Sequence, residues 1–308
     1  MDDETARTRA ADQQLLDAMW DFGSPEVSEE RFRDASDDDS YDAHQRAVMA
    51  TQLARALGLQ SKFDEADAVL DALAETGVEP AGGAHAAVAD AGGDTGDTGD
   101  EPDVEPDVEP QGGPDGEPHD DEAATAARRA REAGEIRARI ALERGRLRVT
   151  RGAPADAIGH FTRAVREAAA ADTTFLVLDA LHMLAIADTG HEREWAEEGL
   201  ALVDRSGDRR LKRWGVALHN NLGWTLHEAG DADGALAQFA SALEFANAYG
   251  SAEQRHVARW AVGRCLRTLG RTDEALQIQR ELAEQRPDDT FVQDEIAALT
   301  GTEPTAGA

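Results

Sequence analysis

The sequence is short of several residue types, and each shortage excludes a class of protein. Its 308 residues include one cysteine, so no internal disulfide can form and a disulfide-stapled secreted scaffold is excluded. No apolar run approaches the roughly 20 residues that span a bilayer. The first residues, MDDETARTRA, lack the apolar stretch of a signal peptide. We therefore expect a soluble protein of the cytoplasm that makes no membrane contact.

Lysine is nearly absent. Lys62 and Lys212 are the only two, and the other 29 of the 31 basic residues are arginines, against 62 acidic residues and a net charge of −31. Acidic, lysine-poor composition along a whole chain is typical of proteins from a salt-rich cytoplasm, and acidity that serves one basic partner is the alternative. A net charge of this sign repels nucleic-acid phosphates and anionic lipids, so either partner would need a locally basic face.

Motifs that would identify an enzyme are also missing. The sequence has no HExxH, GxSxG, P-loop, GxGxxG or CxxC, and its nine histidines are scattered. Cys265 is expected to be a buried structural thiol. Paired carboxylates occur throughout so acidic a chain, so they single out no site. We therefore expect no enzymatic activity, no cofactor and no metal site.

One segment departs from the rest of the chain in composition. Residues 80–122 hold six of the ten prolines, nine glycines and fourteen acidic residues but no lysine or arginine, and they include the tandem piece EPDVEPDVEP. Such a segment cannot bury enough apolar surface to offset the entropy lost on ordering. We predict a disordered acidic linker over 80–122, between an N-terminal region at 1–79 and a larger region at 123–300, with a frayed tail at 301–308.

Outside the linker, the pattern is that of an all-α protein. Apolar residues recur at the i, i+3, i+4 and i+7 spacing of helices, and alternating strand-like stretches are missing. The helices also repeat, because five segments align with a small residue in a first helix and an alanine eleven or twelve residues later in a second. The small residues are Ala54, Gly145, Ala185, Gly223 and Gly263, and the alanines are Ala66, Ala157, Ala196, Ala235 and Ala275.

The spacing of these alanines sets the repeat length. The last four are 39, 39 and 40 residues apart, and the first interval, 91 residues, fits one period plus the linker. Four residues after each alanine stands a mostly bulky residue: Leu70, Phe161, Leu200, Phe239 or Gln279. The turns between paired helices carry Gly152, Gly190, Gly230 or Gly270, and glycine commonly ends a helix.

At these residues the sequence resembles the tetratricopeptide repeat (TPR) family. The segment NLGWTLHEAGDADGALAQFASAL matches that family's pattern best, with Gly223, Gly230, Ala235, Phe239 and Ala242 in register. The resemblance covers roughly residues 41–290 and predicts an α-solenoid of five to six antiparallel helix pairs. The period of 39–40 exceeds the roughly 34 residues usual in the family, which implies longer helices or loops.

Both ends of the repeat region carry further signals. Ser28, Phe32 and Ala35 reproduce the i, i+4, i+7 spacing, which predicts a sixth, degenerate helix pair. Near the C-terminus, Asp288, Asp289 and Thr290 can cap a last helix, FVQDEIAAL, and a solenoid needs such a terminal cover.

The resemblance also assigns an inner wall, because in TPR proteins the first helix of each pair lines the concave side. Positions carried over to this wall include Leu142, Glu143, Asp179, Met183, Ile186, Glu228, Val257 and Ala261. The candidate partner-binding residues on it are Arg139, Arg146, His182, Asn220, Asn221, Trp224, His227, Trp260, Arg264 and Arg267.

This wall is rich in arginine, asparagine and tryptophan although the chain is acidic. Arginine and asparagine supply hydrogen-bond donors to a peptide, and tryptophan supplies an apolar anchor. The resemblance therefore implies a protein–protein interaction scaffold or adaptor that binds a peptide or partner segment, and a regulatory ligand-sensing domain is the alternative. Trp224 and Trp260 could instead pack as core, and Arg264 and Arg267 could pair with nearby glutamates, which contributes little at a surface.

Residues 128–151 hold nine arginines and three glutamates on what reads as one long helix. A solvated helix neutralised by the acidic linker accounts for this charge. A nucleic-acid site would have aromatic residues between the arginines, and this stretch has none. Binding of nucleic acid through this helix is therefore the weakest of the three hypotheses, and the sequence does not define an oligomeric state.

Overall fold

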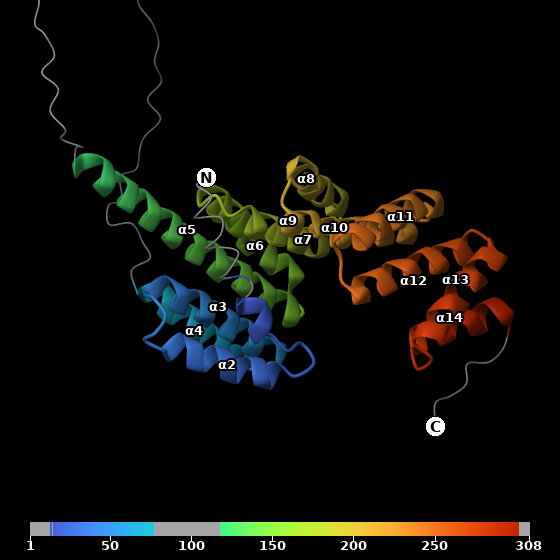
Figure 1. Cartoon of the computed structure of the whole chain (residues 1–308), viewed down its shortest axis with the longest axis horizontal. Helices are drawn as coiled ribbons and strands as arrows, with labels where there is room; N and C mark the ends of the chain where they lie inside the picture. The colour runs from blue at the N-terminus through green and yellow to red at the C-terminus, as the bar shows by residue number, and fades with distance from the viewer. Residues whose placement is uncertain (1–12, 14, 77–117, 302–308) are drawn as a thin grey trace, which may run out of the picture.

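The computed structural model describes residues 13, 15–76 and 118–301, and the regular elements of these ranges are all helices (Figure 1). The all-α prediction is thus confirmed. After a helical stretch at 15–19, the order is α2 (Pro25–Asp37), α3 (Ala43–Leu59), α4 (Phe63–Glu75), α5 (Pro118–Thr150), α6 (Pro154–Ala170), α7 (Thr174–Ala187), α8 (Glu192–Arg205), α9 (Arg209–Lys212), α10 (Trp214–Glu228), α11 (Ala232–Tyr249), α12 (Ala252–Thr268), α13 (Thr272–Gln285) and α14 (Thr290–Thr300).

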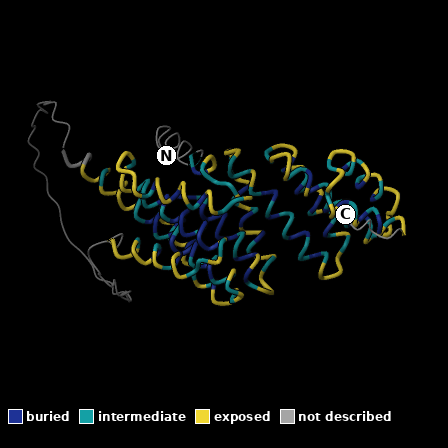
Figure 2. Tube along the Cα trace, turned by 90° about the horizontal axis from the view of Figure 1, so that it is seen from below, coloured by how far each residue is buried: buried dark blue, intermediate teal, exposed yellow. Residues whose placement is uncertain are grey.

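Consecutive helices pack in pairs, and the pairs follow one another in an elongated array that runs from α2 to α14 (Figure 1). The pairs are α3 with α4, α5 with α6, α7 with α8, α10 with α11 and α12 with α13. In α2 the predicted residues Ser28, Phe32 and Ala35 are all buried, as a degenerate second helix requires. Buried residues run along the inside of the array and exposed residues lie on its outer turns (Figure 2).

The helix pairs on the two sides of the linker are neighbours in space. Helix α5 packs against both α3 and α4. Two ion pairs join them, Arg144 Nη2 to Asp71 Oδ1 at 2.6 Å and Arg151 Nη2 to Asp67 Oδ2 at 2.7 Å. The linker therefore interrupts the sequence between two adjacent pairs, which explains the 91-residue interval between Ala66 and Ala157.

Small residues stand where the two helices of a pair touch. A Cβ atom added to Gly145 would lie 2.3 Å from Phe161 Cε1, and one added to Gly223 would lie 2.6 Å from Phe239 Cε1. Atoms cannot approach so closely, so only glycine lets each phenyl ring pack flat on the partner helix. The aligned alanines of the second helices, such as Ala235, are buried as well.

The turns between the paired helices use the predicted glycines. Gly152 and Gly190 have φ of 80° and 96°, and Gly230 and Gly270 have 86° and 73°, a left-handed conformation that glycine adopts without strain. The long period also has a structural basis. Helix α11 alone has 18 residues, and the short helix α9 is inserted between α8 and α10.

The range predicted for the linker, 80–122, overlaps the start of a helix. Helix α5 begins at Pro118, not after residue 122. Proline is well placed in the first turn of a helix, because its missing N–H would have no partner there. The rest of the predicted linker up to residue 117 and the predicted frayed tail from residue 302 lie outside the described residues. Gly301, with φ of 69°, ends α14.

Gln279 is the exception among the bulky second-helix positions and provides a test of the register. It is fully buried and occupies the position that Phe161 and Phe239 hold in their repeats. Its Nε2 donates a long hydrogen bond to Trp260 O at 3.4 Å, and its Oε1 has no hydrogen-bond partner within the described ranges. We expect Gln279→Met to raise the free energy of unfolding by about 1 kcal/mol, because it removes an unsatisfied buried acceptor while it preserves the volume. Thermal unfolding followed by circular dichroism measures the change.

The control for this prediction is Gln277→Met on the exposed side of α13. Its effect should stay within about 0.5 kcal/mol, as for most surface changes. A lower stability of Gln279→Met than of the control would mean that the amide is satisfied in solution and that the register of the last pair is wrong.

Candidate partner-binding face

The first helices of successive pairs contact one another in order: α3 with α5, α5 with α7, α7 with α10 and α10 with α12, after which α14 packs on α12. We call α3, α5, α7, α10 and α12 the A helices, and we call the side formed by their predicted inner-wall positions the A-helix face. Each A helix has one aligned small residue, such as Gly145 or Gly223, and the residue directly after it belongs to the A-helix face. These five residues are Arg55, Arg146, Ile186, Trp224 and Arg264.

Arg146 is the centre of a buried group of charges. Its Nη2 lies 2.5 Å from Asp179 Oδ1 on the neighbouring α7, and its Nη1 contacts Glu143 Oε1 on its own helix. Glu143 is 2% exposed and Asp179 is 7% exposed. Burial disfavours the charged carboxylate of Asp179, but Arg146 and Arg55 outweigh burial and lower its pKa.

His182 and Asn221 connect this group to the next pair. Burial lowers the pKa of His182, and Arg146 and Arg55 lower it further, although Asp179 opposes them. The imidazole is therefore neutral near pH 7. Its Nδ1 lies 3.2 Å from Asn221 Nδ2, so a neutral ring can accept a hydrogen bond from that amide and join α7 to α10.

Arg139 lies on the same face but is bound within the protein. Its Nη2 lies 2.9 Å from Glu135 Oε1, one turn earlier on α5, and the other oxygen of Glu135 lies 3.6 Å from His44 Nε2 of α3. Burial works against ionisation of Glu135, but Arg139 and His44 together lower its pKa to about 2. This side chain therefore serves the packing of α3 on α5.

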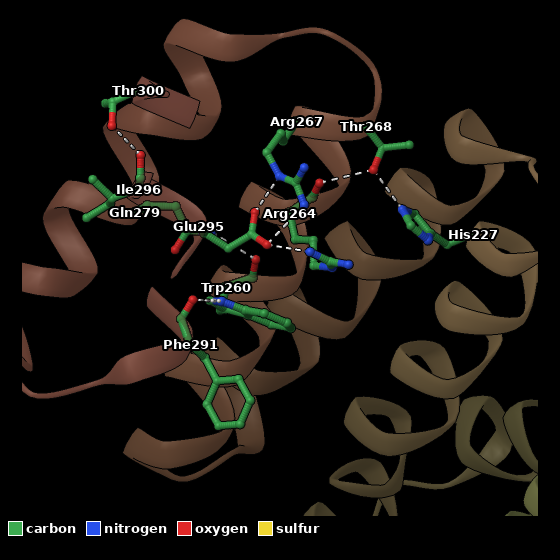
Figure 3. Close-up of polar contacts among 10 residues, drawn as sticks. All are labelled: His227, Trp260, Arg264, Arg267, Thr268, Gln279, Phe291, Glu295, Ile296 and Thr300. Atoms are coloured by element: carbon green, nitrogen blue, oxygen red, sulfur yellow. Dashed lines mark hydrogen bonds and ion pairs between the residues drawn. The ribbon is translucent and has the colours of Figure 1, made fainter. Parts of the chain in front are cut away.

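The two tryptophans of the candidate set lie side by side on α10 and α12. The Trp224 ring packs edge-on against Phe239 with ring centres 4.8 Å apart, and its centre lies 5.9 Å from that of Trp260. Both are half-buried and line the core cluster around Phe239. Trp260 Nε1 donates to Phe291 O of α14 at 3.2 Å (Figure 3). Each indole therefore contributes to the core with part of its surface.

Arg264 and Arg267 converge on one glutamate of α14 (Figure 3). Arg267 Nε donates to Glu295 Oε2 at 2.7 Å, Arg264 Nη1 contacts Glu295 Oε1, and Glu295 is 4% exposed. Of the two interpretations open for these arginines, pairing with a glutamate is the arrangement present. Sequence reasoning identified α14 as a cover but did not identify Glu295 as their partner.

The remaining candidates are dispersed. His227 Nε2 lies 2.8 Å from Thr268 Oγ1, a contact between α10 and α12 (Figure 3). The Oδ1 atom of Asn220 is buried and has no hydrogen-bond partner in the described part of the chain. The structure thus brings Asn221 to His182 and Trp224 to Trp260, whereas Arg139 lies near the other end of the array in contact with α3.

Most arginines of the arginine-rich helix have a carboxylate partner. Six of the nine arginines between residues 128 and 151 have a carboxylate within ion-pair distance, among them Arg137, whose Nε lies 2.8 Å from Glu167 Oε2. A nucleic-acid site would need these groups for phosphates.

Arg55 of α3 is the residue that sequence reasoning missed. It lines a pocket of about 170 Å³ together with Glu143, Arg146, Met183 and Leu59. The inner-wall positions that the TPR resemblance predicts begin with the second repeat, at Arg139, and do not include the first. Extending the same register to Ala54 would have identified Arg55 as the equivalent of Arg146.

Within the described ranges no helix is long and apolar enough to cross a membrane, and no group of histidine, cysteine and acidic residues is arranged to hold a metal ion. No family model matches the chain, and no curated protein matches it.

Proposed function

We propose that this protein is a TPR-type helical-repeat adaptor that binds a segment of a partner protein along the A-helix face. The observation that carries the proposal is the location of exposed apolar side chains. Leu59 and Ile186 are each 50% exposed, and Val257 is 44% exposed. All three occupy inner-wall positions of A helices, where large exposed hydrophobics are otherwise unexplained.

Phe291 extends this apolar series to the end of the array. It is 70% exposed, and its ring packs edge-on against Trp260 (Figure 3). Half-buried aromatic side chains next to exposed aliphatic ones are typical of anchor points in protein interfaces. An extended segment laid across successive A helices would contact one such side chain after another.

The size of the pocket favours a segment over a small regulatory ligand. Small-molecule sites usually measure about 300–1,000 Å³. The pocket beside Arg55 has about 170 Å³, enough for one side chain of a partner. We therefore prefer segment binding to ligand sensing.

The test is the double variant Leu59→Ser and Ile186→Ser, with Val27→Ser as its matched control. Val27 is 36% exposed on α2, away from the A helices. Immobilised wild-type chain captures proteins from a lysate of its source cells at high salt, and mass spectrometry quantifies them. We expect the double variant to lose at least tenfold of the specifically captured protein, because about 2 kcal/mol of anchor burial disappears.

The control should retain what the wild type retains, and both variants should melt like the wild type, since the replaced side chains are exposed. Unchanged capture by the double variant would contradict binding on the A-helix face. Equal losses in the double variant and the control would show that capture depends on surface hydrophobicity in general.

A further inference from the structure

The Arg55 guanidinium is held in place by two aromatic rings from the turn that follows the helical stretch at 15–19. It lies 5.5 Å from the ring centre of Trp20 and 5.8 Å from that of Phe22. The two rings are stacked, 4.7 Å apart and nearly parallel, and Trp20 Nε1 donates to Gln52 Oε1 at 3.0 Å. Because Gln52 is on the same helix as Arg55, the platform and the guanidinium are fixed relative to each other.

Arg55 differs from the other arginines of the A-helix face because no described residue supplies it with an acceptor. Arg139, Arg146, Arg264 and Arg267 each form an ion pair with a carboxylate. Within residues 15–76 and 118–301, Arg55 has neither an ion pair nor a hydrogen bond, although it is mostly buried. A guanidinium carries five N–H donors, and those of Arg55 stay open to solvent, because none of its nitrogens is among the buried side-chain atoms that lack a hydrogen-bond partner in the described ranges. The stacked rings hold these open donors in place before any ligand arrives. The position therefore favours an acceptor supplied from outside.

The pocket walls define what that acceptor is attached to. The lining combines charged side chains, Arg55, Arg146 and Glu143, with the apolar side chains of Leu59, Leu147 and Met183. Arg146 forms direct ion pairs with Glu143 and Asp179, and the two negative charges of these carboxylates are offset by Arg146 and Arg55 together. Of the two guanidiniums, Arg55 is the one without a direct hydrogen bond in the described ranges, so an incoming anion would bind to its donors. Glu143 would repel a doubly charged phosphate more strongly than a singly charged carboxylate.

We propose that this pocket binds the carboxylate of one aspartate or glutamate side chain in the partner segment, with an adjacent apolar residue of that segment on Leu59. The guanidinium fork matches a carboxylate with two parallel hydrogen bonds. This inference rests on the proposed function, because it names one anchor of the segment that the A-helix face would bind.

The test uses fluorescent twelve-residue peptides with blocked ends in which one Glu-Leu step is set in a serine and alanine background. Matched peptides carry Gln-Leu or phosphoserine-Leu instead, and fluorescence anisotropy gives the dissociation constants with the full-length chain in one high-salt buffer. We expect the Glu-Leu peptide to bind at least tenfold more tightly than the Gln-Leu peptide. Arg55→Gln should remove this difference, and Arg55→Lys should restore only part of it because lysine lacks the fork.

The matched control is Arg205→Gln, which removes an arginine exposed on α8 and should leave every affinity unchanged. Equal binding of the Glu-Leu and Gln-Leu peptides by the wild type, or equal weakening of both by Arg55→Gln, would overturn the carboxylate anchor. Tighter binding of the phosphoserine peptide would overturn it in favour of a phosphate site. Each variant is first shown to melt like the wild type, and Arg55→Lys serves as the charge-retaining variant should Arg55→Gln fail to fold.

The lysate experiment separates this inference from the function on which it rests. Loss of capture in the Leu59→Ser and Ile186→Ser variant with full capture by Arg55→Gln would leave the adaptor function in place and overturn the anchor. Full capture by both variants would overturn binding along the A-helix face, on which the proposed function depends.

Discussion

Arg146→Met is expected to lower the free energy of unfolding by about 3–5 kcal/mol, the usual cost of leaving buried charges without their partner. Glu143 and Asp179 would remain nearly inaccessible to water, and both would lose the guanidinium that balances them. Methionine preserves most of the length of the side chain, so the loss reports on charge more than on volume. Urea unfolding followed by circular dichroism measures it.

Acidification provides an internal check on this variant. In the wild type Asp179 has a lowered pKa, so its stabilising contribution is present above the ordinary aspartate pKa and is lost as the pH falls through the lowered value. Without Arg146, burial would act on Asp179 with less opposition and raise the pKa of this carboxyl, and its protonation would relieve the penalty. The stability gap between wild type and variant should therefore narrow from pH 7 to pH 5.

The triple variant Arg146→Met, Glu143→Met and Asp179→Leu is the control, because it removes all three charges together and should recover most of the loss. A single-variant loss below about 1 kcal/mol, the range of solvent-exposed pairs, would show that water reaches this group and that α5 and α7 pack less closely than described.

Phe239→Ala is expected to cost about 3–5 kcal/mol, since it removes a fully buried ring from the contact between α10 and α11. The more specific expectation concerns its coupling to Gly223. In the wild type Gly223→Ala should destabilise, because the new Cβ would lie 2.6 Å from the phenyl ring. In the Phe239→Ala background the same change should stabilise by up to about 1 kcal/mol, because the obstruction is gone and alanine favours the helix over glycine.

Gly159→Ala is the matched control for this cycle. Gly159 lies within α6, and a Cβ added there would meet nothing within 4 Å. Its effect should therefore be mildly stabilising and the same in both backgrounds. If Gly223→Ala also has one sign in both backgrounds, Gly223 and Phe239 do not face each other, and the helix register of the fourth repeat is wrong.

The helix pairs could be predicted from sequence because steric requirements repeat with a fixed period. A small residue such as Gly223 is needed where a bulky side chain of the paired helix lies on the backbone, and from Gly145 to Gly263 the aligned small residues recur at intervals of 40, 38 and 40 residues. Periodic apolar spacing and glycine turns added independent support. The start of α5 was missed because acidic composition dominated the reading of residues 118–122, although Pro118 is a common first residue of a helix.

The charge balance of the A-helix face could be predicted only in part. Glu135 stands four residues before Arg139, a spacing that suggests the pair on sequence grounds. Asp179 and Glu295 belong to the next helix along the face and to the last helix of the array, so their pairing with Arg146 and Arg264 depends on the packing of pairs. The predicted inner-wall positions are therefore rich in arginine, but in the folded protein carboxylates from the same and neighbouring helices pair with Arg139, Arg146 and Arg264.

The pocket beside Arg55 has walls from both sides of the 42-residue interval between α4 and α5. Arg55 and Leu59 come from α3, whereas Glu143, Arg146 and Met183 come from α5 and α7. Any ligand that binds to both walls therefore also connects the helices before this interval to the helices after it. Its binding free energy would stabilise the packing of α3 and α4 against α5. Ligand binding should therefore make separation of these helices less favourable, and separation of these helices should weaken ligand binding.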